Sequence, residues 1–251
     1  MLEIFYYLLI ALGVNILMFI PAYLFKTDKL TDLSYSFSFV IVITIALLIN
    51  GLNVFNLILT TMVILWGLRL GTFLFIRIRN MKRDKRFDGI RESFVRFLRF
   101  WLLQGLGVWI ILLPALFFMQ SQSRKVFLLG GFIWAFGLMI ESIADLQKYS
   151  FKQIKANRNK FIQQGLWRYS RHPNYFGEIL CWIGIYLFVF ISLSSVEMIM
   201  ALLSPAFIII ILLFVTGIPP LEKKAEEKWG GTKEYREYKR KTNLLIPWLP
   251  K

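Results

Sequence analysis

The chain has 251 residues, of which 57% are hydrophobic and 17% aromatic, and its mean hydropathy is +0.59. Soluble domains average closer to half apolar, so this composition predicts an integral membrane protein. A net charge of +15 would also suit a nucleic-acid-binding protein. In a membrane protein, basic loops that face the cytoplasm and its anionic lipids explain that charge better. We therefore expect membrane lipids as partners, no nucleic acid and no obligate protein partner.

The chain contains a single cysteine, Cys181, and a single histidine, His172. These counts exclude an internal disulfide, a cysteine-based metal cluster and a histidine-rich metal site. A metal site built from mixed carboxylates stays open, and no residue is singled out as a metal ligand. The first apolar run is too long for a typical signal peptide and no small-residue cleavage site follows it, so we expect no signal peptide.

Seven apolar runs are each long enough to cross a bilayer. They predict an all-α polytopic membrane protein, a seven-transmembrane-helix bundle that forms one domain over residues 1–251. The expected spans are 2–25, 33–49, 54–76, 100–119, 126–144, 175–193 and 196–218. Short connections join the second span to the third and the sixth to the seventh, so both pairs are expected to form antiparallel helical hairpins.

The basic residues are distributed very unevenly between the two sides of this bundle. Of the 30 lysines and arginines, 27 lie in the loops 26–32, 77–99 and 145–174 or in the tail after 218. Only Arg124 and Lys125 lie on the opposite side, and Arg69 lies within the third span. The positive-inside rule then predicts an N-terminus outside, a C-terminus in the cytoplasm and a cytoplasm-facing active site. The expected location is a bacterial inner membrane, or the endoplasmic reticulum in a eukaryote.

The densest polar stretch is residues 165–178, Gly-Leu-Trp-Arg-Tyr-Ser-Arg-His-Pro-Asn-Tyr-Phe-Gly-Glu, which we call the signature segment. Polar and ionisable groups at a membrane helix are costly and usually serve a site. Pro173 suits the first turn of a helix, whose free amide N–H groups attract anions. Arg168 and Arg171 present planar guanidinium groups that match phosphate oxygens. The segment therefore predicts an anion or nucleotide site.

Other polar residues lie within or beside the spans. Glu141 and Asp145 are four residues apart on one helical face, either as an interfacial pair bonded to lysines or as contacts to a ribose or nicotinamide amide. Asp32 is expected to be the N-cap of the second helix. Pro219 and Pro220 are expected to end the seventh helix. The tail beyond them alternates aromatic and charged residues, which predicts a folded cap.

No nucleotide-binding motif of a known kind is present in the sequence. No Gly-x-Gly-x-x-Gly follows a strand pattern, and there is no P-loop. The Gly105-Leu106-Gly107 stretch lies within a span and is expected to be a packing point between helices. A nucleotide would therefore have to bind without a Rossmann domain.

The signature segment resembles the C-terminal signature of the steroid 5-alpha-reductases and of a group of bacterial membrane proteins related to them. The resemblance extends over most of the chain, through residues 31–33, 68–71, 103–105, 141–152 and 222–248. Sterol reductases share the Arg-His-Pro-Asn-Tyr core of residues 171–175. Membrane isoprenylcysteine methyltransferases carry a similar core.

The resemblance implies a seven-helix bundle whose C-terminal half, about 126–251, holds NADPH, with a lipid-like substrate entering from the bilayer. It implies hydride transfer to the β carbon of a steroid-like or other lipid enone, while a proton donor polarises the carbonyl. Glu178 would line the same pocket and act in catalysis. The residues that the resemblance assigns to the cofactor are Glu141, Asp145, Lys152, Arg168, Tyr169, Ser170, Arg171, His172, Asn174, Tyr175, Glu222 and Tyr238.

The sequence departs from the steroid enzymes at the substrate. Those enzymes carry a tyrosine three residues before the third-helix arginine and a glutamate on the second helix that partners it. Here Trp66 occupies the tyrosine position, and residues 33–49 contain no glutamate. We expect Tyr35 to substitute, so Tyr35, Arg69 and Glu178 are the predicted catalytic residues.

Two other functions stay open. One is an S-adenosylmethionine-dependent carboxyl methyltransferase of the isoprenylcysteine type, and the other is a non-catalytic membrane scaffold. The two arginines of the signature segment favour a phosphorylated cofactor, because the sulfonium donor has no phosphate. The cost of the polar cluster disfavours a scaffold.

Overall fold

The computed structural model describes residues 2–79 and 87–249. All regular secondary structure in those two ranges is helical, and seven helical stretches are long and apolar enough to cross a membrane. The predicted all-α, seven-span fold is therefore confirmed. The chain forms two compact units, which are Met1–Phe127 with Val189–Ser204 (unit 1) and Leu128–Phe188 with Pro205–Lys251 (unit 2).

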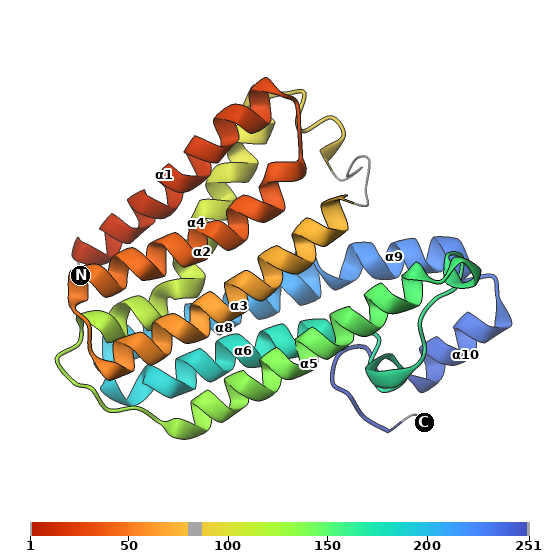
Figure 1. Ribbon diagram of the computed structural model, residues 1–251. Coiled ribbons are helices and arrows are strands. Elements are labelled where there is room, and N and C mark those ends of the chain that lie inside the picture. The colour runs from red at the N-terminus through yellow and green to blue at the C-terminus, as the bar shows by residue number, and fades with distance from the viewer. Residues whose placement is uncertain (1, 80–86, 250–251) are drawn as a thin grey trace. The chain divides into compact units, whose positions relative to one another are not determined.

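Unit 1 is built on four long helices, which Figure 1 shows in red to yellow. Helix α2 packs against the other three, and α1 also packs against α4. Its helices are α1 (Leu2–Leu24), α2 (Lys29–Asn50), α3 (Val54–Arg79), α4 (Phe94–Gln120), the short 3-10 helix η4 (Phe190–Ser192) and α7 (Ser195–Ala201). The three-residue turn between α2 and α3 confirms the first predicted hairpin.

A buried polar network joins three helices of unit 1. The side-chain nitrogen of Gln104 on α4 donates to Asn15 Oδ1 at 2.8 Å and to Ser34 Oγ at 2.9 Å. Asn15 Nδ2 donates in turn to Ser38 Oγ at 3.0 Å. Within an apolar bundle such bonds hold helices together, because a side chain that leaves the network loses its partners.

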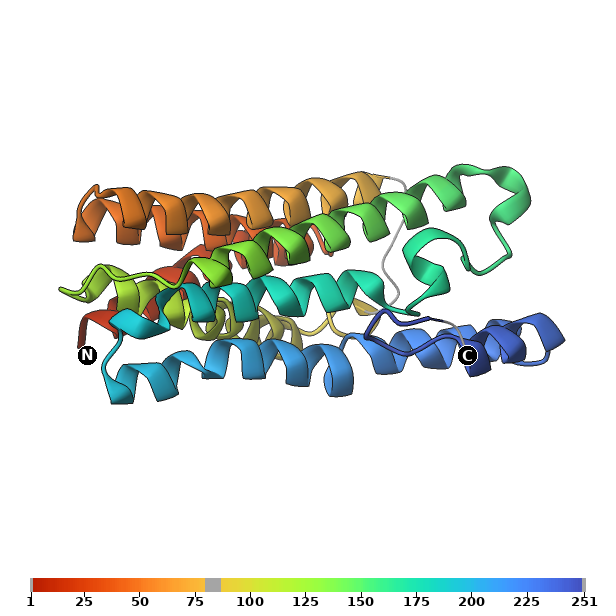
Figure 2. The same cartoon turned by 90° about the horizontal axis from the view of Figure 1, so that it is seen from below.

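Unit 2 contains α5, α6 and the C-terminal helices, drawn in green to blue in Figures 1 and 2. Both views show α5 and α6 side by side. The elements are α5 (Leu128–Gln153), the 3-10 helices η2 (Lys155–Asn157) and η3 (Gly165–Arg168), α6 (Pro173–Val189), α8 (Leu203–Ile210), a π-helical turn (Ile211–Val215), α9 (Ile218–Trp229) and α10 (Lys233–Lys241).

Glycines allow α5 and α6 to touch backbone to backbone. A Cβ atom placed on Gly137 would lie 2.7 Å from the carbonyl oxygen of Gly177, and one placed on Gly177 would lie 2.7 Å from the backbone nitrogen of Glu141. Gly130 and Gly184 meet in the same way near the other end of the contact. The glycines on each helix are seven residues apart, so they lie on one face. This contact fixes Glu141 directly against the second turn of α6.

Three predicted helix boundaries were wrong, and each error has a local cause. Asp32 is not an N-cap, because the chain already turns at Asp28, whose carbonyl accepts from Thr31 Oγ1 at 2.7 Å, and α2 begins at Lys29. Helix α4 begins at Phe94 instead of residue 100, since the buried Phe97 and Trp101 extend its apolar face.

Helix α5 continues past residue 144 to Gln153. Its buried stripe runs on through Ala144 and Phe151, although charged residues occupy the positions between them. The charged residues lower the local hydropathy of the sequence, but the helical periodicity of the buried residues continues past them.

The seventh span is interrupted. It consists of α7, α8 and the π-helical turn, and it leads into α9. Pro219 and Pro220 lie in the first turn of α9, where a missing N–H costs nothing, so these prolines begin a helix instead of ending one. The prediction that Pro173 lies in the first turn of the sixth helix is confirmed, since that proline is the first residue of α6.

Candidate functional site

The signature segment begins with a short helical turn held on α5. Gly165 has φ +61°, a left-handed conformation that favours glycine, and a Cβ there would also collide with the side chain of Gln147. The Gln147 Oε1 atom accepts from the backbone nitrogen of Leu166 at 3.0 Å. The turn η3 therefore starts from a fixed point on α5.

Trp167 also holds this turn against α5. Its ring is buried in a cluster with Ala144, Phe151 and Ile162, and its Nε1 atom donates to the Ala144 carbonyl at 3.0 Å. The Lys148 ammonium lies 4.6 Å from the centre of the ring, within the range of a cation–π contact. This packing holds the following residues, 168–172, close to the C-terminal part of α5.

The C-terminal tail closes over the signature segment. Residues 242–249 follow α10, and we call them the strap. The backbone nitrogen of Arg171 donates to Asn243 at 2.9 Å, Ser170 Oγ donates to Leu245 at 2.6 Å, and the backbone nitrogen of Trp248 donates to Tyr169 at 3.2 Å. The prediction of a folded tail is thus confirmed.

Helix α10 adds one further bond to this closure. The Tyr238 hydroxyl donates to the Trp167 carbonyl at 2.7 Å. Burial raises the pKa of Tyr238, so its phenol keeps the proton that makes this bond.

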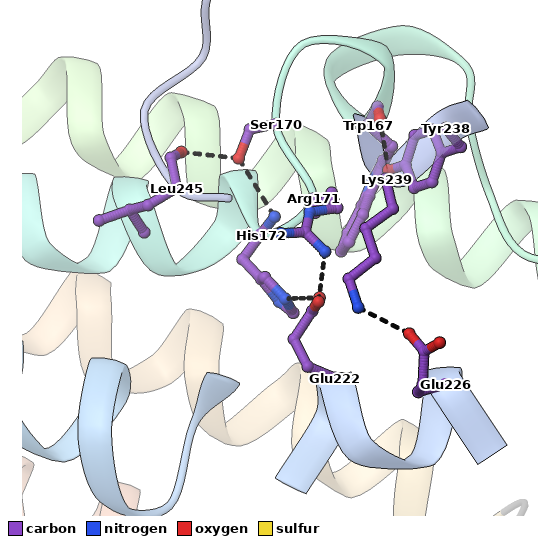
Figure 3. A network of polar contacts seen from close by, with 9 residues as sticks. All are labelled: Trp167, Ser170, Arg171, His172, Glu222, Glu226, Tyr238, Lys239 and Leu245. Atoms are coloured by element: carbon purple, nitrogen blue, oxygen red, sulfur yellow. Dashed lines mark hydrogen bonds and ion pairs between the residues drawn. The ribbon is translucent and has the colours of Figure 1, made fainter. Parts of the chain in front are cut away.

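A charged cluster ties the signature segment to α9 (Figure 3). The Glu222 carboxylate accepts from Arg171 Nη1 and lies 2.8 Å from His172 Nε2. Burial lowers the pKa of His172, and this effect outweighs the opposite pull of the Glu222 carboxylate. His172 is therefore neutral at pH 7 and donates its Nε2–H to Glu222. Its backbone nitrogen donates to Ser170 Oγ at 3.1 Å.

Three polar side-chain atoms at the start of α6 are buried and have no hydrogen-bond partner among the residues that the structure describes. They are Arg171 Nε, His172 Nδ1 and Asn174 Oδ1. With Nε2 of His172 donating to Glu222, its Nδ1 atom carries a lone pair and is an acceptor. Buried polar atoms are paired in most proteins, so such a group within four residues calls for water, an ion or a ligand.

Carboxylates from two helices accompany these atoms. Glu141 and Asp145 on α5 are 2% and 6% exposed, so both acids are buried. Glu178 is half-buried on α6. Tyr175 stacks on His172 with ring centres 5.7 Å apart and nearly parallel planes. Unit 2 therefore combines two buried acids on α5 with a neutral imidazole and two arginines in the residues just before α6.

The profile of one protein family matches residues 18–242, nearly the whole chain, and its description is "protein of unknown function (DUF1295)". The chain belongs to the DUF1295 family. No curated protein and no solved structure matches it. The family match ends at Thr242, so it includes the charged cluster and α10, whereas the strap beyond Thr242 lies outside it.

Several residues that the resemblance assigns to the cofactor have structural partners in this DUF1295 protein. Lys152 Nζ donates to the Lys160 carbonyl at 2.7 Å and lies 5.5 Å from the centre of the Trp229 ring. Ser170 and Tyr238 bond to the strap and to Trp167, as described above. Arg168 is exposed and Tyr169 is half-buried. The assignment of these residues to a cofactor stays a prediction.

The predicted catalytic residues belong to both units of the DUF1295 fold. Tyr35 on α2 and Arg69 on α3 are half-buried members of unit 1, and Glu178 belongs to unit 2. Tyr35 packs edge-on against Phe39, with ring centres 5.1 Å apart. No group of three His, Cys, Asp or Glu suited to a metal ion occurs within residues 2–79 and 87–249.

Sequence reasoning missed Gln147, Lys148 and Trp167. Gln147 and Lys148 lie three and four residues after Ala144, on the face that reaches Phe151. Continuing the helical period of α5 past residue 144 would have placed them beside the signature segment. Trp167 lies inside that segment, but its role as an anchor depends on the contact with α5.

Proposed function

We propose that this protein is an NADPH-dependent membrane reductase that transfers hydride to a carbon–carbon double bond conjugated to the carbonyl of a steroid-like or other lipid. Its family is associated with steroid 5-alpha-reductase-like proteins. The substrate would enter from the bilayer, and the positive-inside rule supports a cofactor site open to the cytoplasm.

The observation that carries this proposal is the group of three buried atoms at the start of α6. An unsatisfied buried polar group costs about 1–3 kcal/mol, so three of them favour a ligand that completes their bonding. Arg171 Nε is a donor, whereas His172 Nδ1 and Asn174 Oδ1 are acceptors. The ligand must therefore offer both acceptors and donors. A dinucleotide does so through its phosphates, hydroxyls and carboxamide.

The residues of unit 2 fit the parts of such a ligand. The guanidinium groups of Arg171 and Arg168 suit phosphate oxygens. The carboxylates of Glu141 and Asp145 can accept from ribose hydroxyls or from the nicotinamide amide. When bound, NADPH supplies the hydride.

Other predicted contacts act by positioning the signature segment. Glu222 holds Arg171 and His172, Ser170 bonds the backbone of His172 and of Leu245, and Tyr238 bonds the Trp167 carbonyl. We propose that these three residues preserve the arrangement of the cofactor-binding groups, and that Lys152 does the same for the loop that carries Lys160.

For the substrate, we propose that Tyr35 takes the role that a tyrosine at position 66 would have had. A phenol hydroxyl can donate to a carbonyl oxygen that gains negative charge as hydride arrives at the β carbon. Arg69 and Glu178 are the charged side chains that we assign to the same reaction. Tyr35→Phe should lower kcat while the affinity for NADPH stays unchanged.

A thermal-shift titration of the purified protein in detergent tests the cofactor. NADPH at about 100 times its Kd should stabilise the protein by about 2.7 kcal/mol. Asn174→Ala should weaken this response, whereas Gln163→Ala, at an exposed loop position, should leave it intact. A shift with S-adenosylmethionine and none with NADPH would make the protein a methyltransferase. No shift with either would favour a scaffold.

A further inference from the structure

The strap has two different edges. The carbonyl groups of Asn243 and Leu245 and the backbone nitrogen of Trp248 bond to the signature segment. The side chains between and after these points are apolar and face outward: Leu244, Ile246, Trp248 and Leu249 are 40%, 59%, 69% and 73% exposed. The bonds to the signature segment are made by backbone atoms of the strap, which leaves these four side chains free to face away from unit 2.

The position of the strap in unit 2 indicates what surrounds these apolar side chains. Its bond to Arg171 is two residues before Pro173, the first residue of the membrane span Pro173–Ser192. The exposed side chains are therefore expected near the depth at which α6 enters the membrane. Tryptophan is enriched at that depth, because its ring prefers the boundary between headgroups and acyl chains.

The charge next to the strap suits the same surroundings. Helix α10 leads into the strap and carries five basic residues against Glu234 and Glu237, a net charge of +3. Arg240 and Lys241, its last two basic residues, are exposed. Basic residues beside exposed apolar ones are the pattern of a segment that lies on an anionic bilayer. A second copy of the chain fits less well, because a symmetric contact would bring these basic residues together.

We propose that the strap is a membrane-surface anchor. Leu244, Ile246, Trp248 and Leu249 insert at the boundary between headgroups and acyl chains of the bilayer that the helices span, and Arg240 and Lys241 contact its anionic phosphates. The signature segment is then bonded on one side to a chain that is itself held by lipid. The anchor depends on the strap, on α10 and on the start of α6, and it is independent of the proposed cofactor.

Depth-dependent quenching tests the insertion. A Leu249→Cys variant carrying an environment-sensitive fluorophore is placed in nanodiscs of mixed phosphatidylcholine and phosphatidylglycerol. Wild-type protein is the blank, since its one cysteine is buried. The emission should shift to the blue, and lipids with a nitroxide near the top of the acyl chain should quench it more than lipids labelled at the chain end. The matched control is Glu234→Cys, on the exposed side of α10, which should show water-like emission without quenching.

Two results would overturn the anchor. One is quenching at position 249 no stronger than at position 234. The other is a blue shift without lipid quenching, which would mean that protein, such as a second copy, covers the strap. For the charge, the double variant Arg240→Glu with Lys241→Glu should lower quenching in anionic nanodiscs to the level seen in pure phosphatidylcholine. Unchanged quenching in this variant would refute the role of anionic lipid.

Discussion

The Glu222 carboxylate on α9 lies 2.8 Å from Nε2 of His172, a residue 50 positions earlier in the chain. This contact joins the start of a membrane helix to the C-terminal region. Because Arg171 donates to the same carboxylate, one acid holds two neighbours of the signature segment. We therefore expect the stability of the region around α6 to depend on charge and on pH.

The first prediction concerns pH. Burial lowers the pKa of His172 below its ordinary value of about 6.5, so below that pH the unfolded chain binds a proton that the folded chain does not. The His172 contribution to stability is therefore present above pH 6.5 and is lost as the pH falls. Thermal unfolding between pH 7.5 and 5 should show a decreasing Tm. His172→Gln should flatten this dependence, and an unchanged slope would contradict it.

The second prediction compares two glutamates of α9. Glu222→Gln removes the charge that faces Arg171 and should lower the free energy of unfolding by about 1.5–3 kcal/mol, the range for hydrogen bonds to charged groups. Glu226→Gln is the matched control, since Glu226 pairs with Lys239 at the exposed surface, 2.6 Å away. Such surface pairs contribute about 0–1 kcal/mol. Equal losses in chemical denaturation would show that Glu222 has no special role.

The third prediction concerns the contact between α5 and α6. In Gly177→Ala, the new Cβ would meet the Gly137 carbonyl oxygen at 2.6 Å and the Glu141 nitrogen at 2.7 Å, so the helices must separate. Overpacking of this kind costs about 1–3 kcal/mol. Gly131→Ala, where the nearest atoms are 3.6 Å away, should leave the Tm nearly unchanged. If Gly177→Ala were as stable as Gly131→Ala, the backbone contact would be refuted.

The fourth prediction concerns the choice of cofactor and rests on the proposed function. Arg171→Ala should weaken NADPH binding about 10- to 100-fold, and NADH binding much less, if its guanidinium holds the adenosine phosphate. Glu222→Gln keeps the Arg171 guanidinium but removes its carboxylate partner. This variant therefore distinguishes a loss of local structure from a loss of the contact between Arg171 and the phosphate. Arg158→Ala, at an exposed position, is the control. Equal losses for NADPH and NADH in Arg171→Ala would refute the assignment.

Patterns of neighbouring residues predicted the features that depend on neighbouring residues alone, such as helix starts and membrane spans. Pro173 marks the start of α6 because a proline fits a first helical turn, and the apolar runs mark the spans because a bilayer requires them. The errors arose where two patterns compete. Glu141 and Asp145 lower the hydropathy of α5 without breaking its helical period, and Pro219 and Pro220 can end one helix as well as begin another.

The arrangement of the candidate site was less predictable than its residue types. The sequence pointed to Arg171, His172 and Glu222 separately, but no local pattern joins positions 50 residues apart. The same holds for the bond between Ser170 and Leu245, at a separation of 75 residues. Such contacts follow from the packing of α9, α10 and the strap, which is decided only when the whole unit folds.

The direct contact of α5 with α6 also bears on how a ligand could be exchanged. With no side chains between the glycines, these two helices have no soft layer that could open and close, so they should move as one rigid body. Ligand exchange would then depend on the strap and on Tyr238, which only a few hydrogen bonds hold to the signature segment. The strap would thus control the exchange of a ligand as well as hold the signature segment in place.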